Sequence, residues 1–166
     1  MGKYLFLPFA FLLTSCQQEK PAQSGPETVV AVPPPVANDD QVLAYIDSLQ
    51  LAVTQHQSRA ALLKLDSMAC ISDGYITEAV DAAAATIWDQ QFTLLLDYLY
   101  QHPKSLLRPQ LIWGLSARLC TEEDRAQALA RFTETSLDSA RRTGLSSAEM
   151  VFLQQILSEV NPALLD

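Results

Sequence analysis

The sequence of 166 residues predicts an all-α domain, an irregular bundle of six or seven short amphipathic helices that follows a leader and a proline-rich linker. Three observations predict this fold class. After residue 38, apolar side chains recur at steps of three and four residues, which places them on one face of a helix. Turns with Gly, Pro or a capping side chain separate these stretches. Outside the linker, the sequence has no alternating apolar and polar run of the kind that forms a strand.

Stacked helical hairpins are the alternative arrangement. Solenoids of this kind show a fixed repeat period, whereas the expected helix starts are irregularly spaced along this chain. The two tryptophans, Trp88 and Trp113, also lie in different local contexts. The sequence therefore favours the irregular bundle.

The first two helices are predicted from their caps and apolar stripes. Segment 38–40 can cap a helix whose stripe runs over residues 42–53. Ser58 can cap a second, shorter helix that continues through Met68. We expect this helix to end near Gly74, because glycine is suited to the turn that follows a helix.

The third and fourth helices follow directly. Residues 76–87 form a stripe with an alanine-rich side, which suits close approach to a neighbouring helix. Residues 92–99 form another stripe, which stops at His102 and Pro103. The sequence leaves open whether these stripes belong to two helices or to one kinked helix.

The fifth helix is expected to carry Pro109 in its first turn, because a proline further inside would remove a helical hydrogen bond. This helix runs through Leu119 and contains Gly114. A glycine inside a helix costs about 1 kcal/mol relative to alanine. Gly114 therefore indicates tight packing against a neighbouring element.

The last two helices have the clearest boundaries. Thr121 offers a side-chain cap, and the acidic residues 122–124 suit the positive end of a sixth helix that closes at Gly144. Residues 146–149 read Ser-Ser-Ala-Glu, which is a capping box for the seventh helix. Asn161-Pro162 is expected to end that helix.

The first sixteen residues have the pattern of a secretory leader. Lys3 precedes an apolar run over residues 4–13, which is too short to span a bilayer that needs about 20 residues. The leader ends in Leu13-Thr14-Ser15-Cys16. This ending resembles the lipobox of bacterial lipoprotein precursors. The resemblance implies cleavage between Ser15 and Cys16 and attachment of lipid to the Cys16 thiol.

The chain is thus expected to have three parts: a signal peptide at residues 1–15, a lipidated cysteine with a disordered linker at 16–38, and an all-helical domain at 39–166. The prolines of the linker prevent helix formation and favour extended polyproline II segments. At about 3.1 Å per residue, a fully extended linker could hold the domain up to about 70 Å from the bilayer.

The lipoprotein resemblance also bears on the compartment. In such precursors, retention at the inner membrane of two-membrane bacteria is typically signalled by Asp after the lipidated cysteine. Gln17 occupies that position in this chain. The resemblance therefore implies an anchor in the outer membrane in preference to the plasma membrane.

The charge of the chain limits its partners. It carries 11 Lys and Arg against 19 Asp and Glu, for a formal net charge of −8. Nucleic acids and anionic lipid head groups are both bound through basic patches. We therefore expect no nucleic-acid partner. The expected partners are the lipid bilayer, reached through the acyl anchor, and an unidentified envelope protein.

Two cysteines remain besides Cys16. Cys70 and Cys120 each lie near the end of an expected helix, and an oxidising envelope permits a disulfide between them. Closing a loop of about fifty residues would stabilise the fold by roughly 4 kcal/mol in the chain-entropy model. Packing of both residues as inert free thiols is favoured over this bond, because small helical domains often use cysteine in this way.

Residues that carry chemistry are few. His56 and His102 lie at expected helix ends without a second metal ligand one turn away, so we expect no metal site. The isolated glycines exclude a phosphate-binding loop, and the nucleophile elbow of serine hydrolases is missing. We accordingly expect no cofactor and no catalytic residues.

Two further groups of side chains could form a site, although a structural role is favoured for both. Carboxylates spaced three or four residues apart share a helix face, and on an acidic protein such pairs are usually solvated. The pairs are Glu78 with Asp81 and Glu134 with Asp138. Aromatic side chains could line a groove, but core packing is favoured. These are Trp88, Phe92, Tyr98, Tyr100 and Trp113.

Together these expectations describe a membrane-anchored bacterial envelope lipoprotein that presents a small helical domain for binding or assembly, without catalysis. Two alternatives remain open. One is an envelope enzyme whose residues come from several helices. The other is a protein that holds an apolar small molecule between its helices.

Overall fold

The computed structural model of the chain describes residues 38–70 and 74–165. These residues form seven α-helices and one 3₁₀ helix, and they contain no strand, which confirms the all-α prediction. The leader and nearly all of the linker, including Ser15 and Cys16, lie outside the described residues. The elements are α1 (Asp39–His56), α2 (Arg59–Ala69), α3 (Gly74–Gln90), α4 (Phe92–Gln101), α5 (Leu107–Cys120), α6 (Arg125–Thr143), α7 (Ser147–Glu159) and η1 (Pro162–Leu165).

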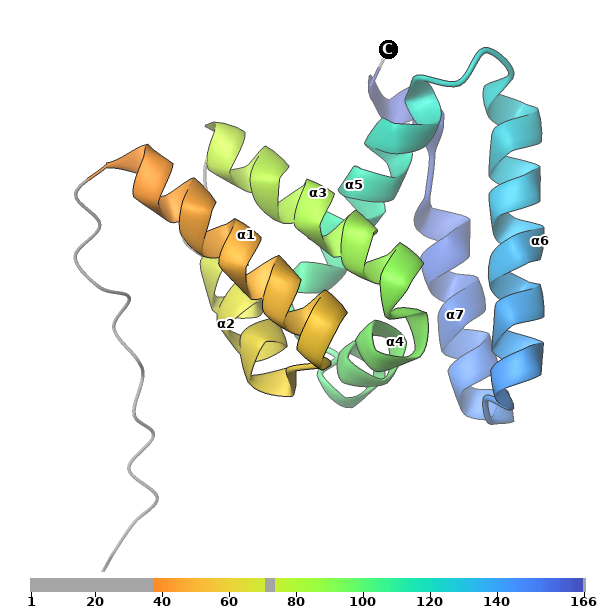
Figure 1. Cartoon of the computed structure of the whole chain (residues 1–166). Coiled ribbons are helices and arrows are strands. Elements are labelled where there is room, and N and C mark those ends of the chain that lie inside the picture. Colours follow the sequence, from red (N-terminus) through yellow and green to blue (C-terminus); the bar gives the residue numbers. More distant parts are fainter. Residues whose placement is uncertain (1–37, 71–73, 166) are drawn as a thin grey trace, which may run out of the picture. The chain divides into compact units, whose positions relative to one another are not determined.

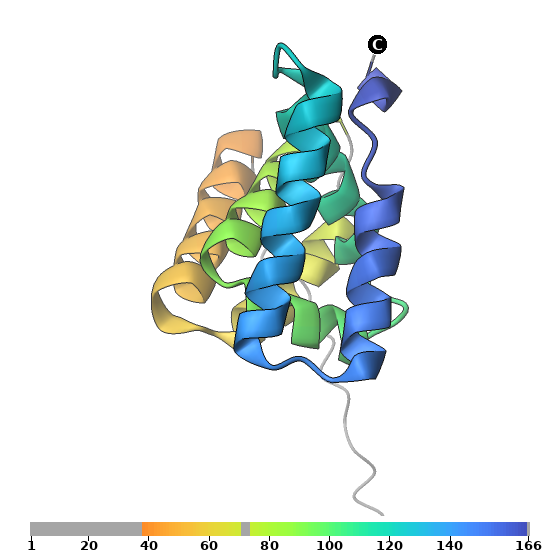
Figure 2. The same cartoon turned by 90° about the vertical axis from the view of Figure 1, so that its right-hand side faces the viewer.

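The helices form an irregular bundle around α3 (Figure 1). Helix α3 packs most extensively on α5 and α1, and it also contacts α2 and α4. Helices α6 and α7 are joined by a short turn and lie side by side in both views (Figures 1 and 2). The C-terminal η1 returns to α5. The irregular arrangement that the sequence favoured is therefore the one observed.

Leucine and isoleucine side chains fill the core. The largest fully buried side chains come from every α-helix except α6, and they are Ile46, Leu62, Leu65, Ile87, Leu95, Leu96, Leu99, Leu107, Leu111, Leu115, Leu153 and Ile156. Burial of each such side chain contributes about 1.5–3 kcal/mol. Helix α6 instead buries only small residues, Ala128, Ser136 and Ala140, so it lies at the margin of the core.

Most of the predicted caps are observed. The Asn38 side chain accepts a hydrogen bond from the Gln41 amide at 3.0 Å. In the predicted capping box, the Ser146 hydroxyl accepts from the Glu149 amide at 3.3 Å, and the Glu149 carboxylate accepts from the Ser146 amide at 2.8 Å. Gly144 ends α6 in the left-handed conformation, with a φ of 72°.

The cap of α6 differs from the prediction. Asp124 is the N-cap, and its carboxylate accepts a hydrogen bond from the Gln127 amide at 2.9 Å. The Thr121 hydroxyl instead donates to the carbonyl of Arg118 at 2.8 Å, within the last turn of α5. A carboxylate at the N-cap also interacts favourably with the positive end of the helix dipole, which a hydroxyl does not.

The question of one or two helices around residue 90 is answered by Gln91. Its backbone leaves the helical region, with φ of −137° and ψ of 46°, so α3 and α4 are separate. The Gln91 side-chain amide donates a hydrogen bond to the carbonyl of Thr54 in α1 at 2.8 Å. This long-range bond fixes the break against α1.

The end of α2 lies slightly before the predicted position. The helix ends at Ala69, and Gly74 is the first residue of α3, with a φ of 51°.

Within residues 38–70 and 74–165, no helix combines the length and apolarity needed to cross a bilayer.

Candidate functional site

Helices α3 and α5 come into close contact at Gly114. A β-carbon at this position would lie 2.2 Å from the main-chain oxygen of Asp81 and 3.3 Å from the β-carbon of Ala85. No side chain could be placed there without moving one helix, which confirms the tight packing that Gly114 predicted. The position of α5 on α3 is therefore set by two backbones in direct contact.

A groove of about 770 Å³ lies between the same two helices. It falls in the size range of small-molecule sites, which is about 300–1,000 Å³. Helix α3 contributes Thr77, Glu78, Asp81, Ala82, Ala85 and Thr86. Helix α5 contributes Pro109, Gln110, Trp113, Gly114, Ala117 and Arg118.

Two residues that line the groove each have a buried side-chain oxygen without a hydrogen-bond partner. These atoms are Oδ1 of Asp81 and Oε1 of Gln110, and both are acceptors. A buried polar atom that lacks a partner costs about 1–3 kcal/mol. Unfilled acceptors in a groove therefore favour a ligand that supplies donors.

The carboxyl group of Asp81 on α3 has a pKa well above its ordinary value. Burial and, as the smaller cause, the nearby Glu78 carboxylate together raise this pKa to about 7. The side chain is half-buried, whereas Glu78 is exposed. The prediction of a solvated Glu78–Asp81 pair is therefore wrong for Asp81.

The second predicted carboxylate pair has the expected surroundings. Glu134 and Asp138 are both exposed on α6. Asp138 forms a surface ion pair with Arg141 at 2.6 Å. This pair is part of the solvated face of α6.

The groove lining includes charged and aromatic side chains. Trp113 is 44% exposed and lines the groove together with Glu78, Asp81 and Gln110. Arg118, also a lining residue, forms an ion pair with Asp89, and its Cζ lies 5.9 Å from the centre of the Phe132 ring on α6. The positive charge of Arg118 is thus already paired, and no other described lining residue is basic.

The predicted aromatic cluster divides between core and surface. Trp88 and Tyr98 are buried, and Trp88 makes an edge-to-face contact with Phe92 at 4.8 Å between ring centres. Core packing is therefore correct for these residues. Tyr100 and Trp113 are exposed, and Trp113 lines the groove.

The predicted cysteine sites have different outcomes. Cys16 lies outside the described residues. Cys70, exposed at the end of α2, and Cys120, half-buried at the end of α5, are both free thiols in the structure. The Cys120 thiol donates to the carbonyl of Ala117 at 3.0 Å. A disulfide between Cys70 and Cys120 under oxidising conditions stays a prediction.

The histidines lie at helix ends, as predicted. His56 is the last residue of α1, and His102 follows the last residue of α4. Nδ1 of His102 lies 2.8 Å from the Tyr98 carbonyl, and the two rings stack with their centres 4.3 Å apart. Within the part of the chain that the structure describes, no group of three or more His, Cys, Asp or Glu side chains could hold a metal ion.

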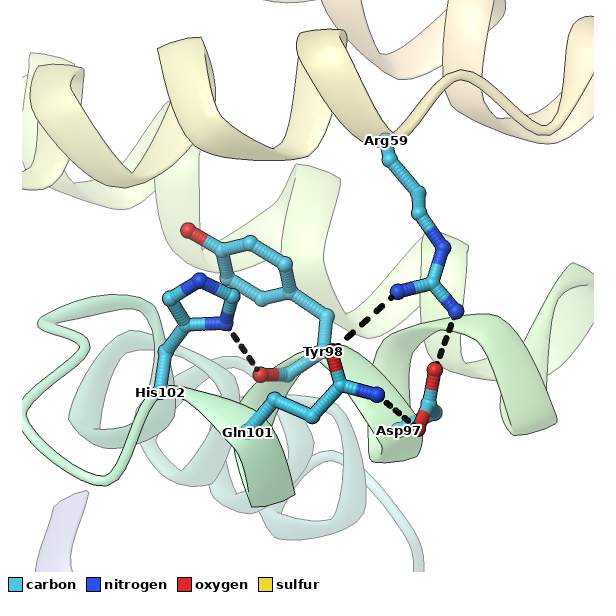
Figure 3. Close-up of polar contacts among 5 residues, drawn as sticks. All are labelled: Arg59, Asp97, Tyr98, Gln101 and His102. Carbon is cyan, nitrogen blue, oxygen red and sulfur yellow. Dashed lines mark hydrogen bonds and ion pairs between the residues drawn. The ribbon is translucent and has the colours of Figure 1, made fainter. Parts of the chain in front are cut away.

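A second polar cluster joins α2 to α4 (Figure 3). Arg59 of α2 forms an ion pair with Asp97 and donates to the Gln101 side chain at 3.4 Å. The Gln101 amide in turn donates to Asp97 at 2.6 Å. These groups satisfy one another on the surface, so we interpret the cluster as structural.

Asp66 of α2 connects its helix to α4 and α5 through two hydrogen bonds. Its carboxylate accepts a hydrogen bond from the Tyr98 hydroxyl at 2.9 Å and another from the Leu107 amide at 3.1 Å. It therefore links α2 to α4 and to the first residue of α5. Burial, with the Asp66 carboxylate as hydrogen-bond acceptor and charge, raises the pKa of Tyr98 above its usual value.

The comparisons with known proteins return no match: no protein-family model, no curated protein and no solved structure is significantly similar to this chain. The groove between α3 and α5 is consequently assigned from its own residues. Sequence reasoning identified Gly114, Asp81 and Trp113 separately, but it did not identify Gln110 or bring the four residues together.

Proposed function

We propose that this chain is a membrane-anchored bacterial envelope lipoprotein whose helical domain is a non-catalytic binding module, with the α3–α5 groove as its binding site. The observation that carries the binding role is the pair of buried acceptors, Asp81 Oδ1 and Gln110 Oε1, which lack partners in a groove of about 770 Å³. Such a groove gains hydrogen bonds when a ligand enters it.

The anchor is supported by the sequence Leu13-Thr14-Ser15-Cys16, which resembles a lipobox. Each buried methylene of an acyl chain contributes about 0.8 kcal/mol, so two or three chains hold a protein on a membrane with little dissociation. The proline-containing segment up to residue 38 would let the domain reach ligands away from the bilayer surface. We place this anchor in the outer membrane, because Gln17 follows Cys16.

An envelope enzyme is the second candidate function, and the pKa of Asp81 favours it. A carboxyl group with a pKa of about 7 can act as a general acid or base near neutral pH. Such catalysis also needs a nucleophile or a second group on the other side of the substrate. Glu78 lies one turn from Asp81 on the same helix, and none of the described residues lining the groove is Ser, Cys, His or Lys. A binding role does not need such a second group, and we therefore prefer it to catalysis.

Native mass spectrometry of the full-length protein, extracted from its own membranes in mild detergent, tests the binding role. We expect a non-covalent adduct on the wild-type protein. The variant Trp113→Ala, which lacks the indole ring that lines the groove, should lose most of the adduct.

Val151→Ala is the matched control, because Val151 is a similarly exposed apolar side chain on α7. This variant should retain the adduct at the wild-type level. Absence of any adduct on the wild-type protein, or equal loss in both variants, would contradict a binding site between α3 and α5.

A further inference from the structure

We propose that the α3–α5 groove binds a small organic cation, an alkyl ammonium or guanidinium whose head group lies at Asp81 and Gln110 and whose stem lies against Trp113. This inference rests on the proposed binding function and specifies the chemical class of the ligand. It is argued from the unfilled hydrogen-bonding capacity, the charge and the size of the groove.

The hydrogen-bonding capacity of the groove selects a donor. Both buried atoms without partners, on Asp81 and Gln110, are oxygen acceptors. The terminal torsions of carboxylate and amide side chains are broad, so a small rotation turns either oxygen toward the groove. An ammonium or guanidinium group carries three to five donors and no acceptor, which matches this arrangement.

The charge of the groove selects a cation among the possible donors. Glu78 and Asp81 both line the groove, one turn apart on α3, and Glu78 is exposed. Arg118 is the basic side chain among the lining residues, and it is engaged with Asp89. A neutral donor would leave the two carboxylates close together without a counter-charge, whereas a cation would compensate both.

Trp113 supplies the third component of the site. Trp113 is 44% exposed and lines the groove with Glu78 and Asp81. Tryptophan is the aromatic side chain that attracts cations most strongly. The ring also covers the apolar stem of an alkyl chain, as do Ala82 and Ala117 on the two walls.

The size of the groove favours a small molecule over a segment of another protein. A volume of about 770 Å³ lies within the range of small-molecule sites. Protein interfaces bury far larger areas, about 800 Å² on each partner. We therefore assign the groove to a free cation and treat a basic side chain of a protein as the competing source.

Binding of a cation should depend on the ionisation of Asp81. The charged groups lining the groove beside Asp81 are Glu78 on α3 and Arg118 on α5. Helices α1, α2 and α4, which also pack on α3, contribute no lining residue. A cation favours the ionised carboxylate, so binding releases a proton. With a pKa of about 7, the ionised fraction rises from about a tenth at pH 6 to about nine tenths at pH 8. Affinity should therefore rise about tenfold over this range.

A series of probes with a butyl stem tests the proposal on the full-length protein: n-butylammonium, n-butylguanidinium, n-butanol and pentanoate. They share the four-carbon apolar stem and differ in the head group. Binding is followed by NMR through the two tryptophan indole signals, of which Trp113 is exposed and Trp88 is buried. We expect the two cations to shift the Trp113 signal with at least tenfold higher affinity than butanol, and pentanoate to bind most weakly.

Two variants make the test specific. Asp81→Asn should weaken cation binding about tenfold at pH 8 and remove the difference between pH 6 and pH 8. Glu134→Gln, which removes one exposed carboxylate on α6, should bind like the wild-type protein. If Asp81→Asn fails to fold, the head-group series and the pH dependence of the wild-type protein still decide the outcome.

The possible failures are distinguishable. Equal affinity for butanol and butylammonium, together with a native adduct that Trp113→Ala removes, would overturn the cation assignment and leave the binding function intact. Absence of both probe binding and the native adduct would overturn both proposals. A blocked Gly-Lys-Gly peptide that binds more than tenfold tighter than butylammonium would overturn the small-molecule assignment.

Discussion

Gly114 of α5 lies directly against the main-chain carbonyl of Asp81 in α3. The contact leaves no room for a β-carbon, which would come within 2.2 Å of that oxygen. The same residue thus determines the packing of the two helices and the position of the Asp81 side chain in the groove.

Substitution of Gly114 by alanine should destabilise the fold strongly. The added methyl group meets backbone atoms that cannot move aside, so one helix must shift, at a cost of about 3 kcal/mol. Gly144→Ala is the control, because its added β-carbon meets nothing within 4 Å. The control should cost only about 1–2 kcal/mol, from its left-handed backbone. Urea unfolding of both variants measures the difference, and a smaller cost for Gly114→Ala would contradict the contact.

Removal of the Asp81 charge should change how stability depends on pH. The pKa of Asp81 is raised in the folded state, so the folded protein holds a proton that the unfolded chain releases. Its contribution to stability is present in full below about pH 4 and is lost as pH rises to about 7. Asp81→Asn should therefore gain stability relative to the wild-type protein over this range.

The expected gain at pH 8 is about 1 kcal/mol, reduced from the full linkage value because the side chain is only half-buried. The measurement is the difference between the two unfolding free energies at pH 4, 6 and 8. The lowered pKa of Glu149, caused by its hydrogen bonds to Ser146, is common to both proteins and cancels. A difference that stays constant with pH would show that Asp81 has an ordinary pKa.

Loss of the Tyr98 hydroxyl should weaken the junction of α2, α4 and α5. Tyr98→Phe removes the hydrogen bond to Asp66, which also accepts from the Leu107 amide. A hydrogen bond to a charged group contributes about 1.5–3 kcal/mol, and the variant should lose about that amount in thermal or urea unfolding. Tyr100→Phe, at an exposed tyrosine, should change stability by less than about 0.5 kcal/mol. Equal effects of the two variants would exclude a role for the Asp66 bond.

The thiols of Cys70 and Cys120 should both react with a thiol reagent in protein that has not been reduced. Both are free thiols in the structure, and Cys70 is the more exposed. Thiolate access governs such reactions, so Cys70 should react first. The measurement is the thiol count before and after reduction, with Cys70→Ser to assign the fast phase. A count that rises by two on reduction would establish the disulfide instead.

Several helix boundaries could be predicted because they depend on interactions between residues that are close in the sequence. Ser146 and Glu149 satisfy each other's backbone groups, and Gly144 adopts a conformation that few other residues tolerate, so both helix ends could be located from the sequence. Pro109 lies in the first turn of α5, where a missing amide costs nothing. These features depend only on neighbours in the chain.

The break at Gln91 could not be predicted in this way, because its side chain bonds to Thr54 in α1, far away in sequence. The cap of α6 was predicted at the wrong residue. Thr121 and Asp124 can both cap a helix, but the Thr121 hydroxyl donates to the Arg118 carbonyl in α5, and Asp124 is the N-cap. Local chemistry gives candidates in such cases, and tertiary contacts select one.

The groove was the least predictable feature. Gly114 indicated close packing, but the sequence does not say that its neighbour is Asp81. Asp81 resembles any surface carboxylate until α5 covers part of it, and Gln110 carries no sequence signal of its own. Their roles arise from the approach of two helices, which a periodic pattern does not specify.

The proposed lipid anchor at Cys16 would decide where this groove operates, and intact-mass analysis of the protein purified from the membrane fraction tests it most directly. We expect a chain that begins at Cys16 and is heavier than its polypeptide by a diacylglyceryl group, with or without an N-terminal acyl chain. The Cys16→Ser variant should lack that mass. A wild-type chain with an unmodified Cys16 thiol, or one recovered free in the culture fluid, would contradict the lipid anchor.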